Sequence, residues 1–228
     1  MKRNAIIGAM IVAASLAACK KHDKVEEAPV VAAPVPVAAA PAPAATATTA
    51  EPTAEQADLA KKQALLAYGV MEDKYINDPR GQWATDAKAS SVYGEKEANG
   101  PSDSNIAKNA TGPADDKTWS NSHIDQGFDW LETTFAAPVN ATEVRIVLPR
   151  GQGAEAVNKV ELQDTDGKWN TAWEGISDVK RDERGNRTWF VRTFARTAYK
   201  VKGVKITYAN NLYHDYKVVD AVQLVGDK

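Results

Sequence analysis

Histidine and cysteine, which commonly ligate zinc or act as nucleophiles, are few and scattered in this 228-residue chain. The three histidines are His22, His123 and His214, and no His-x-x-x-His or His-Glu spacing typical of a zinc site is present. There is also no Gly-x-Ser-x-Gly segment and no phosphate-binding glycine loop. The sequence therefore predicts a non-enzymatic protein. A hydrolase with an unrecognised site is the alternative.

The only cysteine, Cys19, ends an apolar N-terminal run. Residues 1–18 are typical of a secretory signal: Lys2 and Arg3 form a basic start, and the apolar run is shorter than the about 20 residues that span a bilayer. A lone thiol in an exported protein is reactive unless it is paired or modified. We therefore expect Cys19 to be modified. The alternative is that it is a small residue within an ordinary signal peptide.

Leu16-Ala17-Ala18-Cys19 resembles the lipobox of bacterial lipoproteins. The resemblance implies diacylglyceryl attachment to Cys19, cleavage before it and acylation of the new amino terminus. Two or more acyl chains anchor a protein stably in a lipid bilayer. An Asp after the cysteine often retains lipoproteins in the inner membrane, and Lys20 stands there instead. We expect a cell-envelope protein anchored in the outer membrane of a double-membraned bacterium.

Composition changes sharply along the chain. Residues 28–50 consist of Ala, Pro, Val and Thr only, a composition that favours extended, polyproline-like chain and cannot form a core. Residues 19–53 are therefore predicted to be a lipidated, disordered tether. The formal net charge is only −2 and there is no basic stripe, so nucleic acid is not an expected partner.

Residues 54–80 are predicted to form a helix or stalk. Thr53-Ala54-Glu55-Gln56 resembles a capping box, and Leu59, Leu66 and Val70 lie on one helical face. Asn77-Asp78-Pro79 ends the pattern. Two interpretations stay open, a solvent-exposed stalk and a helix docked on the following domain.

Residues 81–228 have the pattern of an all-β domain. Short stretches such as Val160–Leu162 and Val204–Tyr208 alternate apolar and polar residues, and turn signals such as Asp164–Gly167 recur about every ten residues. Trp169, Thr171 and Trp173 are expected to share one face of a strand. This pattern predicts a β-sandwich or barrel.

An ordered series of segments resembles discoidin-like domains, the coagulation-factor type C group. The matching segments are Lys88–Tyr93, Asn109–Pro113, Asp116–Trp119, Trp130–Glu132, Val160–Leu162, Asp166–Trp169 and Asp220–Leu224. The resemblance implies a galactose-binding-like jelly-roll β-sandwich, a fold that mostly binds sugars, lipid head groups or proteins through loops at one end. It implies a carbohydrate or other envelope ligand, or alternatively a scaffold or adhesion subunit that recruits a protein partner. The fold alone does not name the ligand.

Successive connections in such a sandwich alternate between its two ends. The loops expected at one end, such as Ala136–Asn140, are short, whereas those at the other end are long, and long loops on a rigid scaffold often carry function. The long loops are residues 121–128, 149–156, 177–187 and 209–216. Their candidate ligand contacts are His123, Asp125, Arg150, Gln152, Arg184, Tyr213 and His214.

Asp220 shares strand parity with the apolar Val218, Val222 and Leu224, so it is expected to point inward. A buried carboxylate needs a partner. The resemblance implies that a structural calcium could fill this role, with Asp115, Asp116, Thr118 and Asp220 as candidate ligands. The alternative, which we prefer, is that backbone amides or a Lys or Arg cap Asp220, so that no cofactor is needed.

Overall fold

The computed structural model describes residues 51–97, 99–100 and 102–228. The predicted signal peptide, Cys19 and nearly all of the tether lie outside these residues. The described elements, in chain order, are α1 (Ala54–Ile76), β1 (Gly81–Ala89), η1 (Ala107–Ala110), β2 (Trp119–Ser120), β3 (Phe128–Pro149), η2 (Ala154–Ala156), β4 (Val157–Asp164), β5 (Trp169–Glu174), β6 (Arg187–Thr193), β7 (Val201–Ala209), η3 (Asn210–Leu212), β8 (Val218–Val219) and β9 (Ala221–Asp227).

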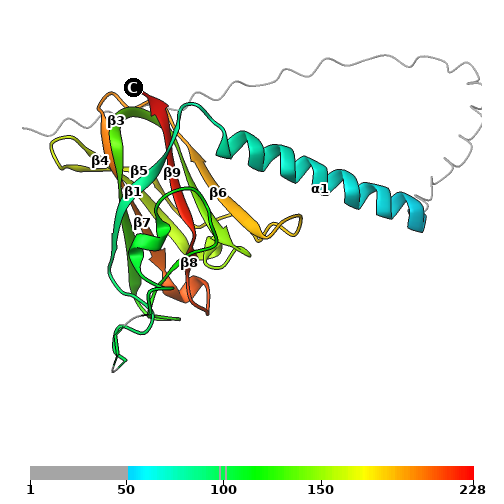
Figure 1. The fold of residues 1–228 in the computed structure, drawn as a ribbon, viewed down its shortest axis with the longest axis horizontal. Coiled ribbons are helices and arrows are strands. Elements are labelled where there is room, and N and C mark those ends of the chain that lie inside the picture. The colour runs from blue at the N-terminus through cyan, green and yellow to red at the C-terminus, as the bar shows by residue number, and fades with distance from the viewer. Residues whose placement is uncertain (1–50, 98, 101) are drawn as a thin grey trace, which may run out of the picture. The chain divides into compact units, whose positions relative to one another are not determined.

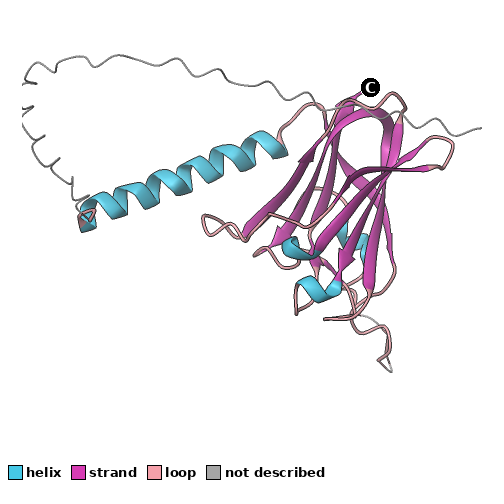
Figure 2. Cartoon of the chain, turned by 180° about the vertical axis from the view of Figure 1, so that it is seen from behind, coloured by secondary structure: helices cyan, strands magenta, loops and turns pink. Residues whose placement is uncertain are grey.

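The long strand β3 joins two antiparallel layers (Figure 1). Its last part pairs with β9 and β6, and β1 pairs with β9, giving sheet A in the order β1-β9-β3-β6. Its first part pairs with β1 and β7, giving sheet B in the order β1-β3-β7-β4-β5. The short strands β2 and β8 pair separately. The layered strands are seen from behind in Figure 2.

The core lies between the two sheets, because alternate residues of each strand face inward. Leu131, Val160 and Ile206 of sheet B belong to one buried cluster with Ile146 and Phe190 of sheet A. The predicted β-sandwich preceded by one helix is therefore confirmed. Within the described parts of the chain, no helix has both the length and the apolar character to cross a membrane.

Two local expectations are wrong. Residues 136–140 are not a loop, since β3 runs through them with an irregularity between Thr134 and Val139. Trp173 does not share a face with Trp169, because the register shifts between Val160 and Glu161. The shift pairs Trp173 with Val160 and turns its ring toward the core, 5.6 Å from the ring of Phe190.

Helix α1 is docked on the outer face of sheet A through its C-terminal part. Thr53 forms the predicted capping box with Gln56 at the start of the helix. Towards its end, Met71 and Tyr75 pack with Trp83 and Trp189 of the sheet. The ring of Tyr75 lies 5.1 Å from that of Trp189.

The buried guanidinium of Arg145 fixes this junction. It donates to Asp78 Oδ2 at 2.8 Å, to the backbone oxygen of Tyr75 at 3.3 Å and to Gln223 Oε1 at 2.8 Å. It also lies 4.4 Å from the ring of Tyr75, a cation–π geometry. The end of α1 is therefore tied to β3 and β9 by charge as well as by aromatic packing.

The docked and stalk interpretations each describe part of the helix. Tyr68 is only 7% exposed and donates to the backbone oxygen of Arg187 at 2.9 Å. On the other helical face, Leu59, Leu66 and Val70 are 56%, 70% and 63% exposed. Helix α1 thus projects from the sandwich (Figure 1), and these three residues form an apolar face that the described residues leave exposed.

Candidate functional site at the long-loop end

Three of the predicted contacts converge at the long-loop end, which carries β8 (Figure 1). Arg150, Gln152 and Tyr213 line one hollow of about 270 Å³ together with Gly151, Glu155 and Arg181. We call it the loop-end hollow. Its residues come from the β3–β4, β5–β6 and β7–β8 connections, which the alternation of loops places at one end.

The segment Arg150–Gly153 follows an unusual backbone path. Arg150 has φ = 51°, in the left-handed region that non-glycine residues seldom occupy, and Gly151 and Gly153 have φ = 73° and 90°. A Cβ on Gly153 would come within 2.9 Å of the Lys217 side chain. The Arg-Gly-Gln-Gly sequence therefore folds this loop tightly onto its neighbours and holds Arg150 and Gln152 at the hollow.

A buried lysine connects two of the loops at this end through hydrogen bonds to their backbone oxygens. Lys217 is 0% exposed, and its Nζ donates to the backbone oxygens of Ile124, Asn210 and His123 at 2.5, 3.2 and 3.4 Å. Burial lowers the pKa of this ammonium to about 8. Three backbone carbonyls from two loops thus share one buried donor.

A second buried group, Asp129, lies beside these loops. Its carboxylate accepts from the hydroxyl of Ser91 at 2.7 Å and from the side-chain amides of Asn121 and Asn210 at 2.8 and 3.0 Å. Burial acts to raise the pKa of Asp129, but these hydrogen bonds outweigh it and hold the pKa below its usual range. The carboxylate also contacts Nδ1 of His123 at 3.1 Å, so it orients that exposed ring.

The electrostatics of the loop-end hollow are set by two guanidinium groups and one carboxylate. Arg181 pairs with Glu183 at 3.3 Å and Glu155 with Lys180 at 2.9 Å, both near the surface. Arg150 makes no salt bridge within the described residues. Burial raises the pKa of Tyr213, so its hydroxyl stays neutral. The hollow can offer a planar cation, an amide and a half-buried phenol ring to a ligand.

The remaining predicted contacts do not line the loop-end hollow. Asp125 and His214 are exposed on the 121–128 and 209–216 loops, and neither lines the loop-end hollow. Arg184 is not part of this site: it pairs with Asp182 at 2.7 Å, and its guanidinium lies 5.8 Å from the ring of Tyr68. It therefore belongs to the junction with α1.

Sequence reasoning missed part of this end of the molecule. Glu155 and Arg181 line the loop-end hollow although neither was a candidate. A second hollow of about 210 Å³ lies at Tyr93 and Tyr216, whose rings meet edge to face with centroids 4.7 Å apart. No sequence signal pairs these two tyrosines, which are far apart in the chain.

The predicted calcium ligands contact protein groups. Asp220 is fully buried; it accepts from the backbone N–H of Asp115 at 3.0 Å and from Nε of Arg187 at 3.3 Å. Arg187 also donates to Asp116 at 2.8 Å. The Asp115 carboxylate faces Lys117, and Thr118 offers its backbone oxygen to Asn109.

These contacts correspond to the capped interpretation of Asp220. Burial raises the pKa of Asp220 in spite of the nearby guanidinium. Among the described side chains, no group of three or more His, Cys, Asp or Glu residues is placed to hold a metal ion.

No family model and no curated protein matches this chain. Several solved structures do match this chain. One is an F5/8 type C domain from Bacteroides fragilis, with 14% identity and a TM-score of 0.49 over 66% of this chain and 99% of that one. Another is a family 32 carbohydrate-binding module from Clostridium perfringens in complex with GalNAc-β-1,3-galactose, with 13% identity and a TM-score of 0.48 over 62% and 94%. A third is chitosan-binding module 1 of a Paenibacillus chitosanase/glucanase, with 14% identity and a TM-score of 0.47 over 63% and 96%. At these identities the likeness concerns the fold alone.

Proposed function

We propose that the sandwich is a non-catalytic carbohydrate-binding domain whose ligand occupies the loop-end hollow. The observation that carries this proposal is the convergence of Arg150, Gln152 and Tyr213 from two separate loops on one hollow. Sugars combine hydroxyl groups with apolar ring faces, and a concave site with an aromatic face and a few fixed polar groups suits both.

The charge of the loop-end hollow indicates which class of sugar it would bind. Arg150 and Arg181 outnumber the single carboxylate of Glu155, and a guanidinium fork matches the two oxygens of a carboxylate. We therefore propose an acidic saccharide, such as one that contains uronic acid, as the preferred ligand.

The proposal is tested by a glycan array of neutral and acidic saccharides probed with the full chain and with an Arg150→Ala/Tyr213→Ala double variant. We expect acidic glycans to be retained by the parent chain and lost by the variant. An Arg196→Ala variant is the matched control, because Arg196 is an exposed arginine that pairs with Asp227, away from the hollow. Equal binding by the parent and the double variant would contradict the proposal.

We also propose that the domain is held at a membrane by acylated Cys19 and the 19–53 tether, in the cell envelope. The support is the sequence alone, since both lie outside the described residues apart from the end of the tether. Metabolic labelling with a radioactive fatty acid tests this: the parent chain should be labelled and a Cys19→Ser variant should not. Label that persists in the variant would contradict lipidation at this residue.

A protein partner is the second candidate function, and one observation favours it. Leu59, Leu66 and Val70 form an exposed apolar stripe on α1, and such surfaces often mark protein contacts. An envelope pull-down with the parent chain and a Leu59→Glu/Leu66→Glu variant tests this role. A partner lost with the variant supports it, and identical captures oppose it.

A further inference from the structure

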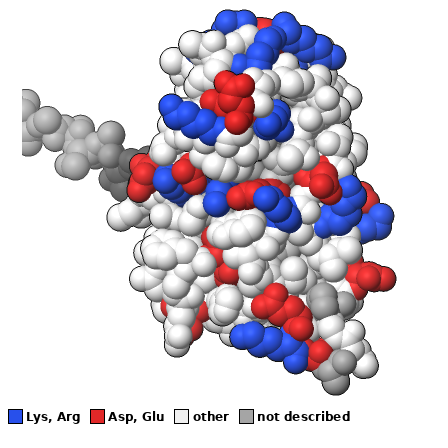
Figure 3. All heavy atoms as spheres, turned by 90° about the vertical axis from the view of Figure 1, so that its left-hand side faces the viewer, with Lys and Arg blue, Asp and Glu red and all other residues white. Residues whose placement is uncertain are grey.

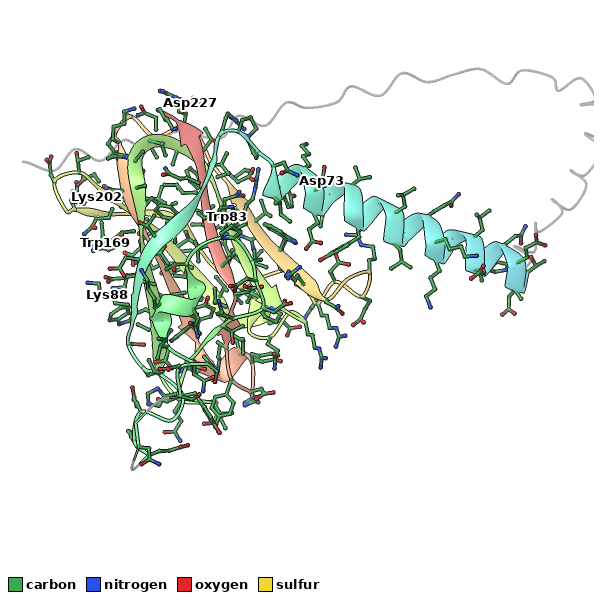
Figure 4. The ribbon with its side chains drawn as sticks, viewed as in Figure 1. Asp73, Trp83, Lys88, Trp169, Lys202 and Asp227 are labelled. Carbon is green, nitrogen blue, oxygen red and sulfur yellow. The ribbon has the colours of Figure 1, made fainter. Side chains whose placement is uncertain are left out.

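Helix α1 does not pack on the outer face of sheet B. Helix α1 lies against the opposite layer, sheet A. Figure 3 shows the left-hand side of Figure 1, where a band of acidic and basic side chains crosses a largely uncharged surface. Lys88 and Trp169 lie on this same side in Figure 4.

One row of the β ladder on this sheet is made of charged residues. Lys88 stands opposite Glu132, Glu132 opposite Lys205, and Lys205 opposite Glu161. The two carboxylate oxygens of Glu132 accept from Lys88 at 2.8 Å and from Lys205 at 3.1 Å. These hydrogen bonds hold the pKa of Glu132 below its usual range although burial opposes them. The row is therefore internally neutralised and fixed in place.

The neighbouring row of the ladder has a gap. Asp86, Thr134, Gly203, Gln163 and Trp169 follow one another across β1, β3, β7, β4 and β5. Gly203 has no side chain to fill the centre of this row. A hollow of about 100 Å³ opens beside it, lined by Asp86, Lys88, Glu132, Thr134, Gln163 and Trp169. We call it the sheet-face hollow.

Two half-buried tryptophans give this face its apolar surface. Trp130 and Trp169 lie on either side of Lys205, whose Nζ is 4.8 Å and 5.8 Å from their ring centroids. Cation–π contacts of this kind hold aromatic rings in fixed orientations. Trp169 thus forms a positioned apolar wall next to a polar hollow.

We propose that the sheet-face hollow is a second saccharide-binding site, separate from the loop-end hollow, and that it takes a neutral sugar chain. The hollow of about 100 Å³ admits one edge or one hydroxymethyl arm of a sugar while the ring lies on Trp169. Each carboxylate that lines the hollow is balanced by a paired cation, Glu132 by Lys88 and Lys205, and Asp86 by Lys108. That balance favours an uncharged ligand, in contrast to the arginine-rich loop-end hollow.

The test is an NMR titration of the ¹⁵N-labelled full chain with cellohexaose, chitohexaose and mannohexaose. We expect at least one sugar to shift the Trp169 indole N–H and the Gly203 amide in a saturable way. Gly203→Val should crowd the side chain of Gln163, which lines the hollow, and valine suits a strand. A Cβ there meets Thr133 O at 3.2 Å and the Gln163 side chain at 3.3 Å, so these neighbours must shift by a few tenths of an ångström. We expect this variant to bind about tenfold more weakly or worse.

The controls separate this site from the proposed function. Thr207→Val changes an outward residue of the same strand with little change in volume, and it should leave the sugar affinity unchanged. The Arg150→Ala/Tyr213→Ala variant should also keep the Trp169 shift, since it alters only the loop-end hollow. If Gly203→Val fails to give a folded spectrum, Trp169→Leu replaces it and should abolish the binding. The inference is overturned if no probe shifts Trp169, or if the shift persists in the variants that change this hollow.

Discussion

Nδ1 of His123 lies 3.1 Å from a carboxylate oxygen of Asp129, so an exposed imidazole is held by a buried charge. The two side chains are 45% and 1% exposed. The same carboxylate also accepts from Asn121 and Asn210, on two of the loops of the long-loop end. The surface offered to a ligand is therefore organised by polar groups beneath it.

Removing the Asp129 carboxylate should loosen the whole loop end. Asp129→Ala leaves several buried donors without an acceptor and removes a negative charge that acts on Lys217, so we expect a loss of about 3–5 kcal/mol in unfolding free energy. His123→Ala should cost about 1 kcal/mol because its ring is exposed. Urea unfolding measures both. An Asp129→Ala protein as stable as the parent would contradict the role given to this network.

Lowering the pH should remove the stabilisation that the Asp129 carboxylate provides. The folded pKa of Asp129 lies below its usual range, so its carboxylate stabilises the fold above about pH 4, and this contribution disappears as the pH falls through the folded pKa. The stability difference between the parent and an Asp129→Asn variant should therefore shrink at low pH. A difference that is constant with pH would oppose this assignment.

Lys217 should give the protein a second pH dependence, at alkaline pH. Its folded pKa of about 8 is below the ordinary 10.5, so between these values the unfolded chain binds more protons than the folded one. The free energy of unfolding should rise between about pH 8 and 10, by at most about 1.4 kcal/mol per pH unit. Lys217→Met should be less stable and lack this rise. A parent-like slope in the variant would show that another group titrates.

The docked position of the Tyr68 ring should depend on Gly185. A Cβ there would fall 2.2 Å from the ring of Tyr68, whereas a Cβ on Gly175 would keep an ordinary 3.6 Å from Trp173. We expect Gly185→Ala to displace the Tyr68 ring from its buried position and Gly175→Ala to leave it in place. Burial and Glu72 raise the pKa of Tyr68 to about 12. Spectroscopic titration should therefore find one more tyrosine near its ordinary pKa of 10.0 in Gly185→Ala, and an unchanged titration would count against docking.

Calcium should not stabilise this domain, because Arg187 lies between Asp116 and Asp220 and pairs with both. We expect the melting temperature of the parent to stay the same on calcium titration. Arg187→Met should lower the unfolding free energy by about 3–5 kcal/mol, since it leaves the buried Asp220 without its cationic partner. A calcium-dependent rise in the melting temperature of the parent would contradict this expectation and support a calcium site near Asp220.

Local patterns predicted much of this architecture. The alternation in β4 and β7 predicts two-faced strands, and Thr53 with Gln56 marks the start of α1. Contacts between segments that are far apart in the chain were harder to predict from the sequence. Nothing near Arg184 in the chain indicates that it lies over Tyr68, and the register shift that turns Trp173 inward depends on its pairing with β4. The sequence predicted Arg150, Gln152 and Tyr213 at one end together with four other contacts, because loop alternation depends only on strand order, but it did not single out these three.

The most direct test of the central claim is an NMR titration of the ¹⁵N-labelled chain with the acidic oligosaccharide that the array retains most strongly. We predict saturable shifts at the amides of Gly151, Gln152 and Tyr213, and affinity about tenfold lower in Arg150→Ala but unchanged in Arg196→Ala. Absence of shifts at these amides, or equal weakening by both arginine variants, would contradict a carbohydrate site in the loop-end hollow.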